Sequence, residues 1–538
     1  VFELGVDSLM SIQLANRLAI DLGLALPSTL IMEYPSIQQL AEQLADELTL
    51  HATNASKPNH LKHADTAEVI PTNTMTTDAA VAWDIYDWFP QSYIQQLYYG
   101  WHEAAENKSF MNMNFVVRIR SVINSEHLQT ATQMLLDRHA DLRLVYDRQN
   151  GQPVQKARRH QPAFFVAQTI DCATWEEARP ALLQASRQPF DLRHDSTMRV
   201  YLFSRTPDDH ILLIVRHHII NDRTSAAIVL DELFTLYHAQ ATDTLVPAPA
   251  APSYFEFLHW HNTMLASEQG QQLWQYWQQQ LSGPLSVLDL PTDYPRHAKN
   301  RHHGGLVNFQ LPATLVNSLR QLAKTHGVTL YAAMLTAFKL LLHFHTGQRD
   351  ILVDTSMINR THQQFEQTIG QLSIMHTLRT QIPAAVSFPV LLKTVQQTVW
   401  DALKHQSYPS QLLLERLAMP KSYVYNRPGQ VLFNLVSSNL TQASLPSLGR
   451  GKLVLEPTRI IPSGSAGTFH EINTQLLEQE DGTITGHINY ETDLYKLSTI
   501  EGLMRRYEVI LQRLVADPQQ TVTDLQNHYA TCQDKEVA

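Results

Sequence analysis

The sequence predicts an α+β protein in which a small helical unit precedes a much larger mixed region, and three patterns support this expectation. Apolar residues recur at helical spacing over residues 36–48, after the capping box Ser36-Ile-Gln-Gln39. Residues 211–215 form an uninterrupted apolar run of strand length, and residues 498–514 return to helical spacing. Because domains usually span ~100–200 residues, the 538 residues predict about three to five folding units.

The composition argues against several classes of protein. The formal charge of −10 gives no reason to expect a nucleic-acid partner. The only two cysteines, Cys172 and Cys532, exclude a disulfide framework and thiolate-rich metal sites, so a reducing, cytoplasmic setting is the simplest interpretation. No apolar run reaches the ~18–20 residues of a membrane span, and no signal-peptide pattern follows Val1. We therefore expect a piece of a longer cytoplasmic protein, with neither a membrane nor a nucleic acid as partner.

The helical unit is expected to contain a first helix from about Ser8 to Leu22 and a second helix after Ser36. The second helix has an apolar face made of Ile37, Leu40, Ala41, Leu44 and Leu48. Residues 50–80 then lose periodicity and fill with polar residues and proline, which is typical of a linker.

The larger region mixes strands and helices to its end. Alternating residues predict strands over 350–357 and 484–490, and a second capping box, Ser498 to Glu501, begins a helix. A tract rich in proline and alanine, Val246–Pro252, interrupts the region and suggests two lobes. The apolar face of the last helix consists of Ile500, Leu503, Met504, Tyr507, Leu511 and Leu514.

The first motif is Gly5-Val-Asp-Ser8-Leu9, directly before the first helix. Taken alone, it is compatible with a simple helix N-cap. Together with the helix that follows, residues 26–35 and the capped second helix, it resembles an acyl carrier protein of modular polyketide synthases. The resemblance covers residues 1–48 and implies that Ser8 carries 4′-phosphopantetheine. Such carriers have a whole helix upstream of this serine, and only seven residues precede Ser8, so we expect a truncated carrier that lacks its first helix.

The second motif is Arg216-His217-His218-Ile-Ile-Asn-Asp222-Arg223, at the end of the apolar run. Adjacent histidines on a strand point to opposite faces, which disfavours a shared metal ion, and hydrogen-bonded core histidines are one interpretation. The functional alternative is a general base, because imidazole titrates near pH 6.5 and can take a proton from a nucleophile.

The surroundings favour the functional alternative. The motif resembles the active-site signature of nonribosomal peptide synthetase condensation domains, and the resemblance spans about residues 86–528. Supporting stretches occur in the family's order: Arg138–Arg143, Tyr254–Trp260, Leu288–Pro295, Thr346–Asp350, Ile369–Arg379, His405–Pro409, Gln430–Asn434 and Asn489–Leu494.

This resemblance implies two chloramphenicol-acetyltransferase-like lobes, with donor and acceptor arms entering a passage from opposite faces. It implies that His218 is the catalytic base or transition-state stabiliser, that His217 supports it, and that Asp222 completes the catalytic motif. It also implies a structural ion pair between Asp222 and Arg143. No metal is expected, because a thioester is already activated.

Two positions depart from the family pattern. Arg223 stands where the family usually has glycine, so it narrows the passage, binds an anionic group such as the arm's phosphate or a substrate carboxylate, or signals altered or lost activity. Ile374-Met375 replaces an Asn-Thr pair. His376, on the same strand face as Ile374, is then either a substitute polar gating residue or an ordinary hydrogen-bonded histidine.

The sequence thus predicts a carrier at 1–50, a linker at 51–83, and condensation lobes at 84–249 and 250–530. The expected reaction joins a carrier-bound polyketide or fatty-acyl thioester to an amine or hydroxyl, giving an amide or ester. The expected partners are an upstream polyketide synthase module and a downstream carrier or free acceptor. The main alternative is a non-catalytic condensation-like domain that gates or docks carriers, and a stand-alone alcohol acyltransferase is a third hypothesis.

Overall fold

A computed structural model describes most of the chain. Contacts divide it into one unit spanning Val1–Phe89 and a second spanning Pro90–Ala538. Ser8, Ser36 and most of the tract at 246–252 lie outside the described residues. The described residues are 14–15, 17–18, 22, 30–34, 37–54, 84–242, 244, 252–296, 303–383, 385–417, 429–436, 453–458, 464–465 and 470–537.

Up to residue 54, the described part of the first unit is mainly helical, with α2 at Leu30–Glu33 and α3 at Ile37–Asn54. Its buried cluster consists of Ala15, Leu30, Ile31 and Leu40. Three residues predicted on the buried face of α3 are instead exposed: Ile37 to 65%, Leu48 to 41%, and Ala41 between them. Of the predicted face, only Leu40 is buried and Leu44 is half-buried, so the buried stripe of α3 is shorter than its apolar pattern. α3 also continues beyond the predicted carrier boundary at residue 50.

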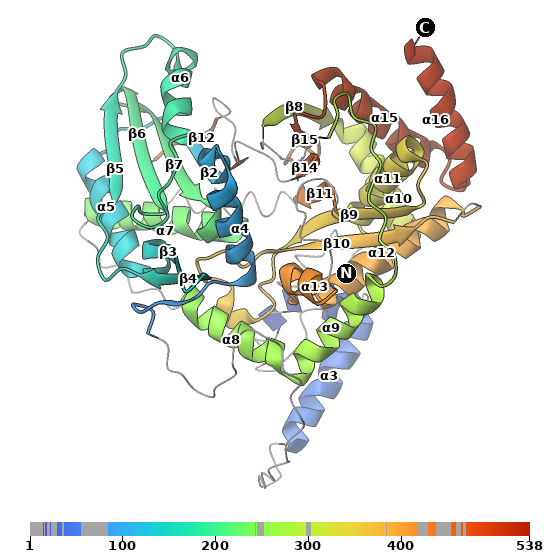
Figure 1. Ribbon diagram of the computed structural model, residues 1–538, viewed down its shortest axis with the longest axis horizontal. Helices are drawn as coiled ribbons and strands as arrows, with labels where there is room; N and C mark the ends of the chain where they lie inside the picture. The colour runs from blue at the N-terminus through green and yellow to red at the C-terminus, as the bar shows by residue number, and fades with distance from the viewer. Residues whose placement is uncertain are drawn as a thin grey trace. The chain divides into compact units, whose positions relative to one another are not determined.

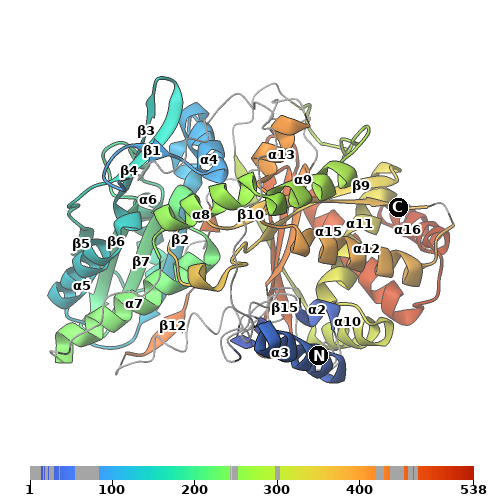
Figure 2. The same ribbon diagram turned by 90° about the horizontal axis from the view of Figure 1, so that it is seen from below.

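The second unit begins with a mixed half whose sheet has the order β12-β2-β7-β6-β5. Helices α5 and α7 cover one face of this sheet and share its core (Figures 1 and 2). β7 lies inside the sheet with all nine residues buried, which confirms the strand predicted from the apolar run. The elements of this half are β1 (Phe89–Pro90), α4 (Tyr93–Ala104), η2 (Lys108–Met111), β2 (Asn112–Ile119), α5 (Ser125–Arg138), η3 (Ala140–Arg143), β3 (Leu144–Gln149), β4 (Gln152–Ala157), β5 (Phe164–Thr169), α6 (Trp175–Ser186), β6 (Met198–Thr206), β7 (Asp209–His217), η4 (His218–Ile220) and α7 (Arg223–Thr242).

The remaining half contains a six-stranded sheet with the order β10-β9-β11-β14-β15-β8. Its elements are α8 (Tyr254–Ala266), α9 (Glu268–Gln280), β8 (Gly304–Leu311), α10 (Ala313–His326), α11 (Leu330–Thr346), β9 (Asp350–Met357), η5 (Gln363–Phe365), β10 (Ile374–Gln381), α12 (Phe388–Lys404), α13 (Ser410–Arg416), β11 (Val431–Val436), β12 (Leu455–Pro457), β13 (Gly464–Ser465), β14 (Ile472–Glu478), β15 (Ile484–Glu491), α15 (Leu497–Ala516) and α16 (Val522–Val537). The strands predicted over 350–357 and 484–490 are confirmed.

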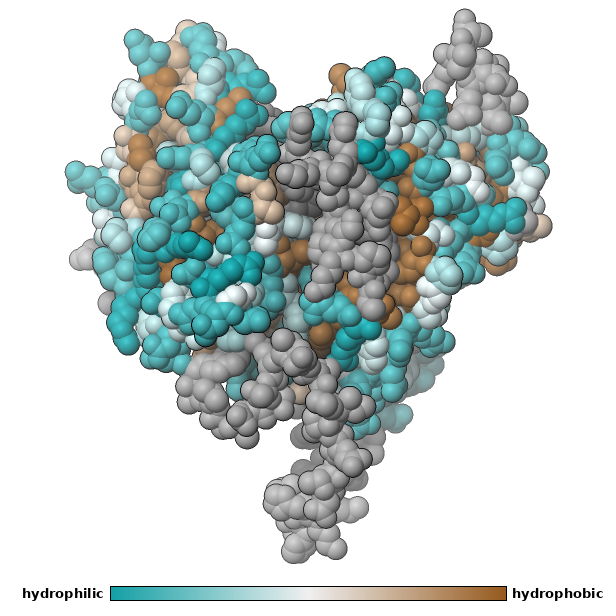
Figure 3. Space-filling view, in the orientation of Figure 1, coloured by the Kyte–Doolittle hydropathy of each residue, from teal (hydrophilic) through white to brown (hydrophobic). Residues whose placement is uncertain are grey.

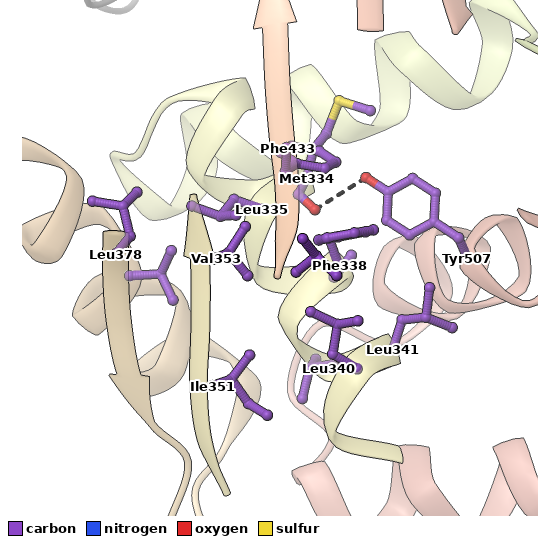
Figure 4. Packing of buried hydrophobic residues seen from close by; sticks show 14 of the residues in the cluster. Met334, Leu335, Phe338, Leu340, Leu341, Ile351, Val353, Leu378, Phe433 and Tyr507 are labelled. Carbon is purple, nitrogen blue, oxygen red and sulfur yellow. Dashed lines mark hydrogen bonds between the residues drawn. The ribbon is translucent and has the colours of Figure 1, made fainter. Parts of the chain in front are cut away.

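One core fills the space between this sheet and helices α11, α12 and α15. Figure 4 shows Phe338 of α11 packed toward Val353 of β9, and the hydroxyl of Tyr507 donates a hydrogen bond of 3.0 Å to the carbonyl of Met334. Burying apolar side chains at ~25 cal/mol per Å² makes this core the main source of stability in this half. Hydrophilic residues, in turn, cover most of the face seen in Figure 3.

The last long helix confirms one prediction and corrects another. All six residues of its predicted apolar face are buried. The capping box predicted at Ser498 is wrong, because α15 already begins at Leu497 and Lys496 occupies the N-cap without a side-chain hydrogen bond. Complete capping boxes lie instead at Ser92 with Gln95 and at Ser253 with Glu256.

Two strands from late in the chain complete the first half's sheet. β12 pairs antiparallel with β2, with Leu455 opposite Ile119, and β13 pairs with the same strand at Asn114 and Met113. The two halves are therefore connected by backbone hydrogen bonds as well as by side chains.

Among the described residues, no single helix is long and apolar enough to cross a membrane, and α10 and α11 pass that test only as a pair bent by 103°.

Candidate functional site

The two adjacent histidines lie at a change of backbone conformation. β7 ends at His217, and the short helix η4 begins at His218, so the two rings enter different surroundings. His217 is fully buried, and its Nδ1 accepts a hydrogen bond of 3.1 Å from the backbone N–H of Ile219. A neutral ring with Nδ1 as acceptor carries its proton on Nε2, which lies 3.1 Å from Nδ1 of His102 and donates to it. His217 is thereby fixed in the interior, where burial and, after it, the neighbouring basic groups hold its pKa well below the usual value.

His218 is only half-buried, and its ring lies against Tyr98, with 4.6 Å between the centroids. Burial lowers the pKa of His218, while the charge of Asp222 and the side chain of Gln371 act in the opposite direction. The ring is therefore neutral near pH 7, which is the form that can accept a proton. Tyr98 and Gln371 were not predicted from the sequence, because they come from segments far from the motif.

Asp222 is buried and forms its ion pair with Arg360, whose Nη2 lies 3.1 Å from Oδ1. The same carboxylate accepts hydrogen bonds from the backbone N–H groups of Ser225, at 2.7 Å, and Leu372, at 3.2 Å. Burial alone would raise the pKa of Asp222, but Arg360 and the hydrogen bonds from Ser225 outweigh burial and hold it below its usual value. Asp222 thus caps α7 and connects the two halves of the unit.

The predicted ion pair between Arg143 and Asp222 is wrong. The Nε of Arg143 donates to the carbonyl of Leu136 at 2.9 Å, and its Nη1 donates to the carbonyls of Arg158 and Arg159. Arg143 therefore stabilises the turns around η3. The ion-pair partner of Asp222 is Arg360, which follows β9 in the stretch that leads to Gly370. A basic residue in that stretch was the available sequence signal for this pairing.

A serine hydroxyl strengthens the connection between the halves. The Oγ of Ser225 donates to the carbonyl of Gly370 at 2.7 Å and accepts from the N–H of Gly370 at 3.0 Å. It also accepts from Nη2 of Arg360 at 3.0 Å. A hydroxyl has one donor and two acceptor positions, and all three are used here.

Gly370 has no room for a side chain, because a Cβ atom there would lie 2.2 Å from the ring of Tyr254. We expect Gly370→Ala to lower the free energy of unfolding by about 1–3 kcal/mol through overpacking. Gly502→Ala is the matched control: its Cβ would meet no atom closer than 3.8 Å inside α15, and alanine is favoured there by ~1 kcal/mol. Chemical denaturation of both variants measures the difference, and equal effects would contradict the close packing at Gly370.

Arg223 is the first residue of α7 and directly follows Asp222. Its side chain is exposed, yet crowding by surrounding protein atoms lowers the pKa of its guanidinium. The Arg223 side chain is therefore close to other protein atoms but still in contact with water. Burial and, after it, the charge of Arg223 lower the pKa of His487, on β15, to about 4.

The gating role suggested for His376 is contradicted. The residue lies on the same strand face as Ile374, as predicted, but only 1% of it is exposed. Its ring stacks on Trp277 at a centroid distance of 4.3 Å, and its Nε2 lies 2.8 Å from the carbonyl of Gln406. His376 is therefore an ordinary hydrogen-bonded core histidine.

The serine predicted to carry the phosphopantetheine arm, Ser8, lies outside the described residues. Within the part of the chain that the structure describes, no group of three His, Cys, Asp or Glu side chains is arranged to hold a metal ion.

Comparison with known families identifies both units. The condensation domain family matches residues 86–534, which is most of the chain. The phosphopantetheine attachment site family matches residues 1–44.

Individual relatives are large synthases. Tyrocidine synthase 3 of Brevibacillus parabrevis is 27% identical over 530 residues, which cover 97% of this chain and 7% of that protein. Polyketide synthase PksN of Bacillus subtilis (strain 168) is 30% identical over 418 residues, which cover 76% of this chain and 7% of that protein. The chain thus spans only a small part of the length of these relatives.

Solved structures agree on the fold. The condensation domain from the Monacolin K polyketide synthase MokA matches with a TM-score of 0.71 at 17% identity, over 81% of this chain and 99% of that one. The X-domain from teicoplanin biosynthesis matches with a TM-score of 0.72 at 24% identity, over 81% and 96%. The predicted two-lobed, chloramphenicol-acetyltransferase-like fold is confirmed. The chain belongs to the condensation domain family of nonribosomal-peptide and polyketide assembly lines, and its first residues match the carrier type that bears 4′-phosphopantetheine on a serine.

Proposed function

We propose that this chain transfers a polyketide or fatty-acyl group from a carrier thioester to an amine or hydroxyl, forming an amide or an ester. The observation that carries the proposal is the half-buried, neutral imidazole of His218 at the junction of the two halves, beside the Asp222–Arg360 pair. Ser8 is the proposed attachment point of the arm, which supplies a thiol that presents the acyl group in activated form.

His218 acts as the proton acceptor in this proposal. The nucleophile's N–H or O–H loses its proton to the imidazole as its nitrogen or oxygen bonds to the acyl carbon. The carbon–sulfur bond breaks, and the imidazolium returns the proton to the departing sulfur. Each turnover therefore leaves the protein unchanged and needs no oxidant or reductant. A base placed in this way typically contributes about 10²–10⁴-fold to the rate.

The surrounding residues position His218 rather than react. Asp222 is held by charge-assisted and backbone hydrogen bonds, so its carboxylate fixes the turn from η4 into α7. His217 anchors the other end of that turn through Ile219 and His102. Holding the thioester and nucleophile together would supply much of the remaining rate, on the order of 7–11 kcal/mol at best.

Mass spectrometry of the acyl-loaded chain tests the reaction directly. Incubation with a panel of free amines and free alcohols should release a product heavier than the acceptor by the acyl group. Amide products alone would identify an amine acceptor, and ester products alone a hydroxyl acceptor. Absence of product with every member of both panels, while the acyl group stays on the chain, would favour a carrier-docking or gating role and overturn the proposal.

Loading itself depends on Ser8. We expect a phosphopantetheinyl transferase with coenzyme A to add one phosphopantetheine group to the parent chain and none to Ser8→Ala, because only a hydroxyl can form the phosphodiester. Ser11→Ala, three residues later, is the matched control and should load as the parent does. Intact-protein mass spectrometry reads both results, and loading of Ser8→Ala would place the arm on another residue.

A further inference from the structure

Helix α4 presents one side chain to each of the two adjacent histidines. Tyr98 and His102 lie four residues apart on α4, and side chains at this spacing share one face of a helix. The ring of Tyr98 lies against the imidazole of His218, with 4.6 Å between the centroids and 55° between the planes. The ring of His102 meets His217 edge-on at 4.9 Å, and a hydrogen bond of 3.1 Å joins these two rings. The position of one helix therefore determines the surroundings of both imidazoles.

Contacts at its first turn hold α4 in place. Ser92 and Gln95 form the capping box of the helix, and the Oγ of Ser92 lies 2.9 Å from the hydroxyl of Tyr254, on α8. The Oε1 of Gln95 accepts a hydrogen bond of 2.8 Å from the Nε2 of Gln155, on β4. Tyr98 follows within one turn of these anchors and is itself buried, so its ring has a fixed place in the interior.

The backbone leaves His218 in need of such support. β7 ends at the preceding residue and η4 begins at His218, so the side chain stands at a turn rather than among strand neighbours. A side chain has about three staggered wells at its first torsion, and only some of them direct the ring toward a reacting group. The ring of Tyr98 occupies the space on the α4 side of the imidazole and excludes the orientations that would enter it. It also covers that side of the imidazole from water.

We propose that Tyr98 is a positioning residue for His218, whose ring holds the imidazole in the orientation used for catalysis and covers it on one side. This inference rests on the proposed acyl transfer and adds a residue to it. Tyr98 takes no proton in this account, and its ring rather than its hydroxyl does the positioning, because the ring is the part that lies against the imidazole.

Two substitutions separate the ring from the hydroxyl. Tyr98→Leu removes the ring, so it should lower kcat by about 10–100-fold, the loss that misplacing a reacting group by ~1 Å produces. It should leave KM for the acceptor within about twofold, because acceptor binding does not depend on this contact. Tyr98→Phe keeps the ring and should stay within about threefold of the parent. Steady-state kinetics with the acyl-loaded full chain gives these values.

The next residue on α4 supplies the matched control. Tyr99 is also buried, but one residue turns the helix by ~100°, and its ring lies 5.6 Å from the guanidinium carbon of Arg148, on β3. Tyr99→Leu makes the same change in the same helix. It should lower the free energy of unfolding about as much as Tyr98→Leu does, yet leave kcat within about twofold of the parent. An equal loss of kcat in both leucine variants would mean that damage to α4 is sufficient, and would overturn the inference.

The environment of the imidazole provides a readout that a purely structural role would not change. Burial lowers the pKa of His218, and Tyr98→Leu admits water beside the ring, so this pKa should rise toward 6.5. The neighbouring titratable groups, Asp222 and His217, are the same in the variant, so the shift reports the loss of cover. The low-pH decline of the single-turnover rate should move to higher pH in Tyr98→Leu and stay in place in Tyr99→Leu.

Diethyl pyrocarbonate, which reacts with neutral imidazole, tests the same environment without turnover. Peptide mass spectrometry of the unloaded full chain follows its addition to residue 218 as the pH is varied. The midpoint should lie below pH 6.5 in the parent, Tyr98→Phe and Tyr99→Leu, and higher in Tyr98→Leu. An unchanged midpoint in Tyr98→Leu, or a loss of kcat in Tyr98→Phe as large as in Tyr98→Leu, would overturn the inference. An inactive parent would defeat the proposed function, whereas this measurement would still decide whether Tyr98 covers the ring.

Discussion

Replacing His218 by alanine is expected to lower the rate of product formation by about 10²–10⁴-fold, because the variant loses the group that accepts the nucleophile's proton. His194→Ala is the matched control: the side chain of His194 is 73% exposed and forms an ion pair with Asp191 on the surface. Single-turnover release of product from acyl-loaded protein measures the chemical step directly. Full product formation by the His218 variant would instead support the non-catalytic alternative.

The same residue predicts how the rate depends on pH. Because burial lowers the pKa of His218, the ring stays neutral to a lower pH than an exposed histidine does. The single-turnover rate should therefore remain high as the pH falls through 6.5, and should decline only as the pH passes the lowered pKa. A decline centred at or above pH 6.5 would contradict the neutral, half-buried environment assigned to this ring.

Breaking the Asp222–Arg360 pair is expected to have the largest effect on stability. Arg360→Met keeps most of the side-chain volume but leaves a buried carboxylate without its cation, and this typically costs about 3–5 kcal/mol of unfolding free energy. Chemical denaturation of the second unit within the full chain gives the value. An exposed ion pair contributes about 1 kcal/mol, so a smaller loss of unfolding free energy would contradict the buried Asp222–Arg360 pair.

A double-mutant cycle identifies the partner of Asp222. Asp222→Asn combined with Arg360→Met should show an interaction energy of about 0.5–3 kcal/mol, because the two side chains are in contact. Asp222→Asn combined with Arg143→Met should be additive within about 0.5 kcal/mol, since Arg143 binds carbonyl oxygens elsewhere. The opposite result would restore the pairing that the sequence suggested.

Linkage predicts a further signature of Asp222. Its folded-state pKa is depressed, so its contribution to stability is full above the unfolded value of about 4 and is lost as the pH falls toward the folded value. The parent should therefore lose stability below pH 4 more steeply than Asp222→Asn does. Denaturation midpoints across this range provide the measurement.

The features predicted correctly are those that the local sequence determines. The apolar run of β7 predicts a strand buried in a sheet, and the helical repeat of α15 predicts a helix with one buried face. The structure contains both. The His217–Asp222 motif indicated the position of the site because strand end, turn and cap lie within six residues. A helix start is harder to predict: Ser498 matched a capping pattern, but the N-cap is Lys496, two residues earlier.

The features that were missed depend on segments far apart in the chain. Arg360 lies 138 residues from Asp222, and His102 lies 115 residues from His217. Arg143 was the basic residue that the family resemblance suggested, yet carbonyl groups near η3 already satisfy it. Choosing between two arginines requires knowing which backbone groups each one meets, and a single sequence does not contain that information.

The pairing of β12 with β2 has a consequence for synthesis on the ribosome. Val117–Ile119 of β2 is synthesised early, but its partner strand is translated more than three hundred residues later. Until then the nascent first sheet presents an open edge, which invites association with other chains. Separately expressed halves should for this reason aggregate unless they are produced together, so the unit is poorly suited to being split for engineering at residue 250.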